Sequence, residues 1–100
     1  MFRNNHRVKR GVTKQGNIAG EQVTVELYHY RDDINKLYLN VYVGTKKIKS
    51  VTAYSPYINI MFDKMYAKCE KVRYKKFNEY DNHMLRSLVH FAYMDFNEIW

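Results

Sequence analysis

The sequence predicts an α+β domain in which a three-stranded antiparallel β-meander is followed by two α-helices packed on one face. Three observations support this prediction. Apolar and polar residues alternate over residues 22–51, turn sequences interrupt that alternation, and apolar residues recur at helical spacing from residue 58 onward. Residues 21–100 are expected to form this single domain. Residues 1–20 are expected to be a basic flexible arm, with a short edge strand around residues 7–14 as the alternative.

The first two strands show the alternation most clearly. Their apolar positions are Val23, Val25, Leu27 and His29 before the turn sequence "RDDIN", and Leu37, Leu39, Val41 and Val43 after it. If Tyr30 pairs with Lys36, both apolar sets lie on one side of the hairpin and Tyr28 faces Tyr38 on the other side.

A third strand follows the sequence "VGTK", where Gly44 suits the left-handed backbone conformation of a two-residue turn. This turn would pair Tyr42 with Lys47 and Val41 with Ile48. The strand before the turn is therefore expected to lie at the centre of the meander.

Two helices are predicted in the second half of the chain. Ser55 is a suitable N-cap and Pro56 suits the first helical position, so the first helix is expected to run from there to about Lys76. Asn78 or Asp81 would cap the second helix. The apolar stripes are Ile58, Met61, Phe62, Met65, Cys69 and Val72 in the first helix, and Leu85, Leu88, Val89, Ala92, Phe96 and Ile99 in the second.

The net charge of +7 is unevenly distributed along the chain. Residues 1–20 carry +5, residues 21–43 carry −2, residues 44–77 carry +7 and residues 78–100 carry −3. Two basic zones of this kind favour an anionic partner, either nucleic acid or an acidic protein surface.

Composition narrows the class of protein. No apolar run is long enough to span a membrane, and the single Cys69 excludes an internal disulfide, so a cytoplasmic protein without a membrane partner is expected. The chain is rich in Lys, Asn, Ile, Tyr, Phe and Met and poor in Gly, Ala, Arg and Pro, which indicates an AT-rich genome. Such small basic proteins are common in phages and viruses, in which case the location is the host cytoplasm.

Four lysines of the first predicted helix form a ridge. Steps of four, three and four place them within an arc of about 60° on a helical wheel: Lys64, Lys68, Lys71 and Lys75. An anion such as a phosphate backbone lying along the ridge would relieve their mutual repulsion. Alternatively, the lysines could be solvated, with stems that cover the core edge, or acids of the second helix such as Asp95 and Glu98 could reach across to them.

The N-terminal segment is the second candidate for contacts with anions. Before residue 20 it contains five cations and no acid: Arg3, Arg7, Lys9, Arg10 and Lys14. A basic arm that folds onto nucleic acid is one interpretation, and a solubilising tail is the other.

Tyrosines occupy the polar side of the predicted hairpin, where Tyr28, Tyr38 and Tyr42 lie mid-sheet and Tyr30 lies near the turn. Together with Lys47 and Lys49, these rings could stack on the bases of a single strand. They could also form a protein interface, including that of a homodimer, or only stiffen the sheet through favourable cross-strand pairs.

No catalytic constellation stands out. His83 and His90 are seven residues apart, which is not the spacing of a helical metal pair, and Cys69 falls within a core stripe. The sequence therefore predicts a non-enzymatic protein without a metal or cofactor.

The leading functional hypothesis is a small accessory protein that binds nucleic acid, DNA or RNA, through the arm and the lysine ridge. The alternative is a protein-binding modulator or inhibitor of a host enzyme or defence complex, which would use the tyrosine-rich sheet face and the basic surface.

Overall fold

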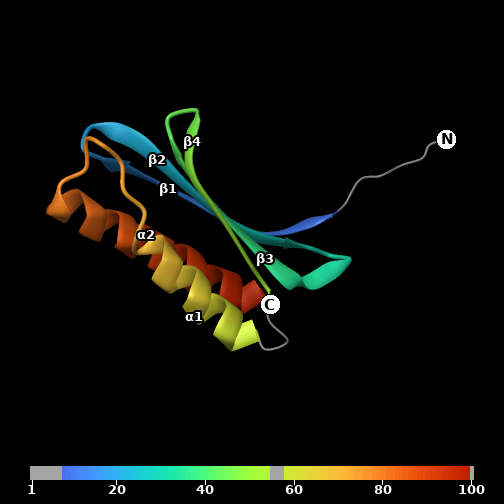
Figure 1. Cartoon of the computed structure of the whole chain (residues 1–100). Helices are drawn as coiled ribbons and strands as arrows, with labels where there is room; N and C mark the ends of the chain where they lie inside the picture. The colour runs from blue at the N-terminus through green and yellow to red at the C-terminus, as the bar shows by residue number, and fades with distance from the viewer. Residues whose placement is uncertain (1–7, 55–57, 100) are drawn as a thin grey trace.

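The structure, a computed structural model, describes residues 8–54 and 58–99 and has an α+β architecture (Figure 1). Four antiparallel strands form one sheet in the order β1-β2-β3-β4, and two helices follow them in the chain. The elements are β1 (Lys9–Ile18), β2 (Glu21–Tyr30), β3 (Asp33–Val43), β4 (Lys46–Tyr54), α1 (Ile58–Cys69) and α2 (Glu79–Ile99).

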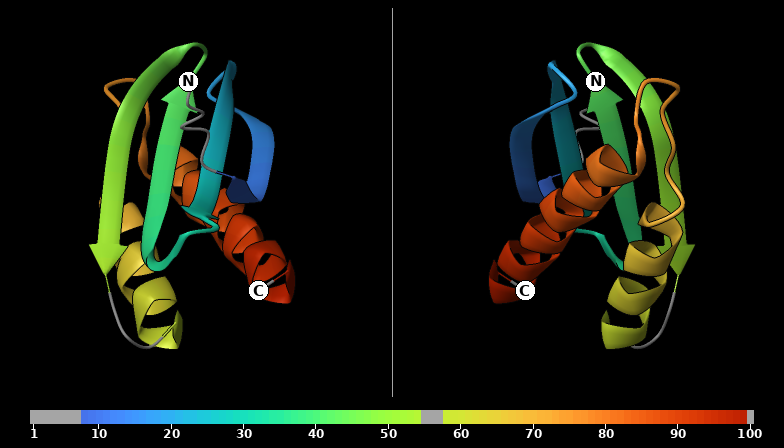
Figure 2. Two further views of the ribbon diagram at one scale, coloured as in Figure 1. Left: turned by 90° about the vertical axis from the view of Figure 1, so that its right-hand side faces the viewer. Right: turned by 90° about the vertical axis from the view of Figure 1, so that its left-hand side faces the viewer.

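Both helices cover the same face of the sheet, and among the described residues no element covers the opposite face (Figures 1 and 2). α2 packs mainly across β1 and β2, and α1 packs against β4 and β3. The core lies between these layers and includes the predicted apolar side chains of β2 and β3, together with Phe62 of α1 and Phe96 of α2. The two-layer prediction is therefore confirmed.

The sheet has four strands rather than three, because residues 9–18 pair with β2 along their whole length. Ile18 is buried and Val12 packs against the core, so β1 contributes to the same apolar layer as its neighbours. The turn to β2 uses Ala19 at φ 56° and Gly20 at φ 77°, both in the left-handed region. The sequence predicts this edge strand only as an alternative to a flexible arm, and the strand is longer than expected.

The predicted register of β2 and β3 is confirmed over most of the hairpin, with Tyr28 opposite Tyr38. The pairing of Tyr30 with Lys36 is wrong, because the register shifts after His29 and Tyr30 lies opposite Asp33. The irregularity shortens the turn without moving any side chain of the mid-hairpin to the other face.

The register of β3 and β4 starts as predicted, with Tyr42 opposite Lys47. It then shifts, so that Val41 pairs with Lys49 instead of Ile48. Ile48 is the extra residue of a β-bulge, and a bulge moves every later side chain by one position. Consequently Lys49 lies on the helix-covered face, away from the tyrosines that were expected beside it.

α1 is shorter than predicted, because it ends at Cys69 and does not continue to Lys76. The amide of Lys71 donates to the carbonyl of Lys68 at 3.1 Å, and the amide of Val72 donates to that of Cys69 at 2.9 Å. These tight i→i+3 turns close the helix and bring Val72 into the core, where it is 3% exposed. The capping roles expected of Ser55 and Pro56 lie outside the described residues.

α2 begins with a reciprocal cap. The amide of Asp81 donates to Oδ1 of Asn78 at 2.9 Å, and the amide of Asn78 donates to Oδ2 of Asp81 at 3.2 Å. Both residues proposed as alternative caps therefore act together, in the manner of a capping box. The helix then buries Leu85, Val89, Ala92 and Phe96 against the sheet, as its spacing predicts.

Candidate functional site

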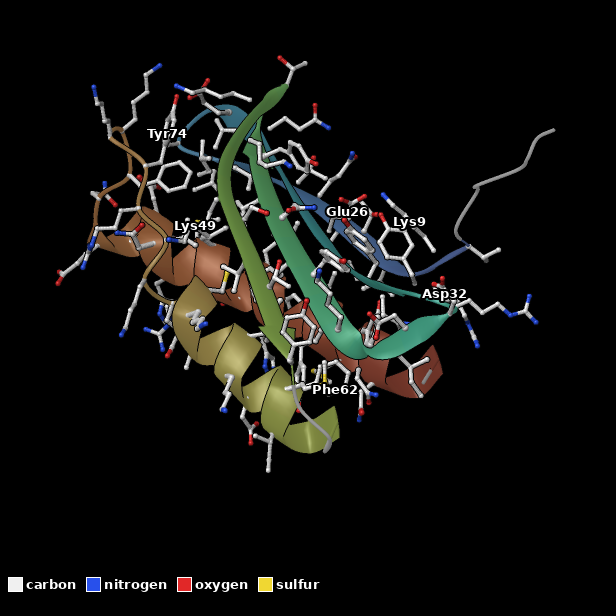
Figure 3. All side chains as sticks on the ribbon, turned by 45° about the vertical axis from the view of Figure 1, so that its right-hand side comes forward. Lys9, Glu26, Asp32, Lys49, Phe62 and Tyr74 are labelled. Atoms are coloured by element: carbon white, nitrogen blue, oxygen red, sulfur yellow. The ribbon has the colours of Figure 1, made fainter. Side chains whose placement is uncertain are left out.

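Basic side chains gather at one end of the molecule, where the β3–β4 turn and β4 meet the segment between α1 and α2. Figure 3 shows Lys49 and Tyr74 at this end, on β4 and on the connecting segment respectively. We call this group the basic cluster, and its members, all exposed, are Lys46, Lys47, Lys49, Lys68, Lys71, Arg73, Lys75 and Lys76.

Two surface hollows organise the cluster. The first lies between β4 and the end of α1 and is lined by Lys49, Lys68 and Lys71 together with residues 50–52 of β4. The bulge in β4 is responsible for this arrangement, because it places Lys49 on the helix-covered face of the sheet, toward Lys68 and Lys71. Three cations around one hollow are a suitable environment for an anionic oxygen.

The second hollow lies beside the first, between the β3–β4 turn and the α1–α2 segment. Its cations are Lys46, Lys47, Arg73, Lys75 and Lys76, and it is also lined by Ile48 and the half-buried Tyr74. Because α1 ends at Cys69, the residues after it cross the end of the sheet instead of continuing along a helix. This crossing brings them to the turn of the β3–β4 hairpin.

The cluster is poorly neutralised by the protein itself. Lys76 Nζ lies 3.7 Å from Glu21 Oε2, and within residues 8–54 and 58–99 the other seven cations have no carboxylate partner. Glu70, the nearest acid along the chain, pairs instead with Arg86 of α2. Uncompensated like charges held close together favour binding of an anion.

Only two of the four lysines of the predicted ridge therefore lie on a helix. Lys64 and Lys68 are on α1, whereas Lys71 and Lys75 belong to the segment that follows it. Lys68, Lys71 and Lys75 line the hollows, but Lys64 lines neither of them. The ridge was expected to be straight, and the early end of the helix bends it into the basic cluster.

The cations of the N-terminal segment are placed differently. Lys9 Nζ lies 3.7 Å from Glu26 Oε2 and 4.3 Å from the ring centre of Tyr28, on the uncovered sheet face (Figure 3). Lys14 forms an ion pair with Asp95 of α2, so this acid neutralises β1 and not the lysine ridge. Arg10 is exposed in β1 opposite His29, and the predicted contacts of Arg3 and Arg7 lie outside the described residues.

Three of the four predicted tyrosines form a closed ring cluster on the uncovered face. Tyr28 and Tyr38 stack with ring centres 5.0 Å apart and an interplanar angle of 5°, and Tyr30 contacts both rings edge-on. Tyr28 is only 8% exposed, and burial raises the pKa of its hydroxyl group. Because the three rings pack against one another, Tyr28 offers little surface to a base or a partner protein.

A polar network continues from this ring cluster across the sheet. Asn40 is 5% exposed, donates from Nδ2 to Glu26 Oε1 at 3.1 Å and accepts at Oδ1 from the hydroxyl of Ser50 at 2.7 Å. Buried amides that are satisfied in this way fix the register of their strands. This part of the uncovered face is therefore a structural feature.

Tyr42 differs from the other predicted tyrosines. It is half-buried near the β3–β4 turn, and Lys47 Nζ lies 5.9 Å from its ring centre. Tyr74, which no sequence pattern indicates, contacts Phe77 at 5.1 Å between ring centres and lines the second hollow. An aromatic ring beside clustered cations is the combination that binds single-stranded nucleic acid.

The buried His29 and Cys69 have the environments of core residues and not of catalytic groups. His29 is 3% exposed, with Nδ1 2.9 Å from the carbonyl oxygen of Tyr30. Burial raises the pKa of the Cys69 thiol to about 12, which makes it a poor nucleophile near neutral pH. In the part of the chain that the structure describes, no group of three or more His, Cys, Asp and Glu residues could hold a metal ion.

Sequence reasoning missed three members of the basic cluster, namely Lys46, Arg73 and Lys76. A helix running to Lys76 would place Arg73 and Lys76 on faces away from the ridge, so the error in helix length hid them. The density of cations in "KVRYKK" is a signal that does not depend on the helix prediction and would have indicated them.

Comparison with known proteins adds no assignment: no family model, no curated protein and no solved structure matches the chain. Among residues 8–54 and 58–99, no helix is long and apolar enough to cross a membrane.

Proposed function

We propose that this protein is a non-enzymatic accessory protein that binds nucleic acid through the basic cluster. The observation that supports the proposal is the convergence of eight exposed cations from three chain segments around two adjoining hollows, with a single carboxylate partner among the described residues. Phosphate groups of one strand would occupy the two hollows, and release of their counterions would drive association.

The aromatic rings at the cluster favour a single strand over a duplex. Tyr42 and Tyr74 lie beside the cations, and unpaired bases can stack on such rings while base pairs cannot. In this proposal, Arg3 and Arg7 would add further phosphate contacts. The protein is further proposed to be of phage or viral origin and to act in the host cytoplasm, in line with the Lys-, Asn-, Ile- and Tyr-rich composition expected of an AT-rich genome.

The experiment is a binding titration of fluorescently labelled single-stranded DNA and RNA with a matched charge control. Lys68→Glu combined with Lys71→Glu reverses two charges of the first hollow and is expected to weaken binding by at least tenfold, or about 1.4 kcal/mol. Arg31→Glu combined with Lys36→Glu makes the same change in net charge at the opposite end of β3. Equal loss of affinity in both variants would refute a defined site.

A second candidate function, a modulator or inhibitor of a host enzyme or defence complex, is favoured by Tyr54. This residue is 62% exposed on the uncovered sheet face, where a partner protein could bury it. Because Tyr38 stabilises the ring cluster, the suitable variant is Tyr42→Ala with Tyr54→Ala. Loss of a host protein from a nuclease-treated pull-down, at unchanged melting temperature, would support this candidate over nucleic-acid binding.

A further inference from the structure

α2 carries a second apolar stripe that faces away from the core. Its members are Tyr80, Met84, Phe91 and Met94, which are 70%, 36%, 56% and 49% exposed. Large apolar side chains exposed singly are ordinary, but four along one side of one helix are of the kind that marks an interaction surface.

The stripe follows a heptad repeat. Steps of four and three residues connect Tyr80, Met84, Ser87, Phe91, Met94 and Glu98. At 100° per residue these positions lie within about 40° of the stripe's centre, and the buried positions Leu85, Val89 and Phe96 point about 140–180° away from it. α2 thus has two apolar sides. The alternating steps of four and three residues on the outward side are the spacing found where two helices pair as a coiled coil.

A hollow lies alongside the stripe, between α2 and β1. It has a volume of about 230 Å³ and is lined by Gly16 and Ile18 of β1 and by Met84, Ser87, Leu88 and Phe91 of α2. The small residues Gly16 and Ser87 leave space here for one large side chain of a partner.

The stripe is complementary to itself when two copies of α2 run antiparallel. Placing Ser87 opposite Phe91 of the second copy also places Met84 opposite Met94 and Tyr80 opposite Glu98. A large ring then meets the hollow beside Ser87, and the hydroxyl of Tyr80 can donate to the carboxylate of Glu98. Every position of the heptad repeat finds a partner in the same set, which is the condition for a two-fold interface.

Charge favours the antiparallel arrangement over the parallel one. A parallel pair would bring two basic clusters to one end and two Glu98 carboxylates to the other. The antiparallel pair separates the two clusters and also the two Glu98 carboxylates, because the last turn of each α2 then lies beside the first turn of the other copy.

From this complementarity we infer that the chain forms a homodimer through antiparallel pairing of the outward stripe of α2. The inference does not depend on the proposed nucleic-acid binding, since no member of the basic cluster lies in the stripe. A second copy is thus the partner that fills the hollow between α2 and β1.

Sedimentation equilibrium of the nuclease-treated full chain tests the inference. Wild type should form a concentration-dependent dimer, and Phe91→Glu should weaken self-association by at least about tenfold, because a carboxylate would be buried in the hollow of the partner. Tyr54→Glu alters another exposed ring, on the uncovered sheet face, and should leave the dimer intact. A monomer at all concentrations, or a dimer insensitive to Phe91→Glu, would overturn the inference.

Cysteine crosslinking tests the direction of the pairing. Met84→Cys chains mixed with Met94→Cys chains should form a disulfide-linked heterodimer, whereas Met84→Cys chains alone should not crosslink efficiently. The native Cys69 is 1% exposed and does not interfere. Efficient crosslinking of Met84→Cys with itself would show parallel pairing and would contradict the proposed register.

Discussion

Gly11 shows how closely β1 approaches the tyrosine cluster. A Cβ atom at this position would lie 2.3 Å from the carbonyl oxygen of Leu27 and 2.4 Å from Cβ of Tyr28. Neither atom belongs to the movable end of a side chain. We therefore expect Gly11→Ala to lower the free energy of unfolding by about 1–3 kcal/mol, measured by urea denaturation.

Gly16 provides the matched control in the same strand. A Cβ atom there would meet only the methyl groups of Leu88, at 3.7 Å, which is an ordinary contact distance. Gly16→Ala should leave stability unchanged or raise it slightly, because alanine restricts the unfolded chain. Equal destabilisation by both substitutions would show that the close approach at Gly11 does not determine the result.

The buried thiol of Cys69 leads us to expect a loss of stability at alkaline pH. Its thiol has a pKa of about 12 in the folded protein, because of burial, against an ordinary value of 9.0. Between these values the unfolded chain binds fewer protons than the folded one, so the free energy of unfolding falls as pH rises from about 9 toward 12. Denaturation at several pH values should show a smaller alkaline decline for Cys69→Ala than for wild type, and parallel declines would contradict this role.

At the scale of elements, the cap of α2 is the clearest local determinant of the fold. Asn78 and Asp81 satisfy each other's backbone amides, so removing either side chain breaks a shared arrangement. Asn78→Ala should cost about 1 kcal/mol of stability by thermal or urea denaturation. The double variant with Asp81→Ala should cost less than the sum of the two single variants, and strict additivity would argue against the reciprocal cap.

The elements also show what the sequence can and cannot predict. Alternation of apolar residues predicts β2, β3 and the pairing of Tyr28 with Tyr38, because a one-residue slip would expose the core face. The bulge at Ile48 and the end of α1 at Cys69 leave no comparable signal. Ile48 can satisfy either register, and Val72 is apolar at helical spacing although it reaches the core from a turn.

The bulge and the early end of α1 also explain why the sequence predicts the candidate site incompletely. The sequence indicates that cations concentrate in residues 44–77, but it distributes them along one helix and one sheet face. Their actual grouping depends on the bulge, which turns Lys49 to the helical side, and on the early helix end, which brings Arg73 and Lys76 to the β3–β4 turn. Tertiary contacts of this kind are not encoded in local periodicity.

At the scale of the whole molecule, charge and apolar surface are segregated. The basic cluster occupies the end where the α1–α2 segment meets the β3–β4 turn, and the exposed stripe runs along the outer side of α2. A dimer formed through the stripe would present two basic clusters at opposite ends and could contact one strand twice. Binding of a long single strand should therefore exceed that of a short one by avidity, and Phe91→Glu should remove this difference while leaving the affinity for the short strand unchanged.

The salt dependence of single-strand binding tests the central claim most directly. If phosphates occupy the basic cluster, the logarithm of the binding constant should fall linearly with the logarithm of salt concentration, by about 0.7 per neutralised phosphate. Lys68→Glu with Lys71→Glu should reduce the slope by about 1–2, whereas Arg31→Glu with Lys36→Glu should leave it unchanged. Binding that is independent of salt, or a slope that both variants share with wild type, would contradict the assignment of the basic cluster as the nucleic-acid interface.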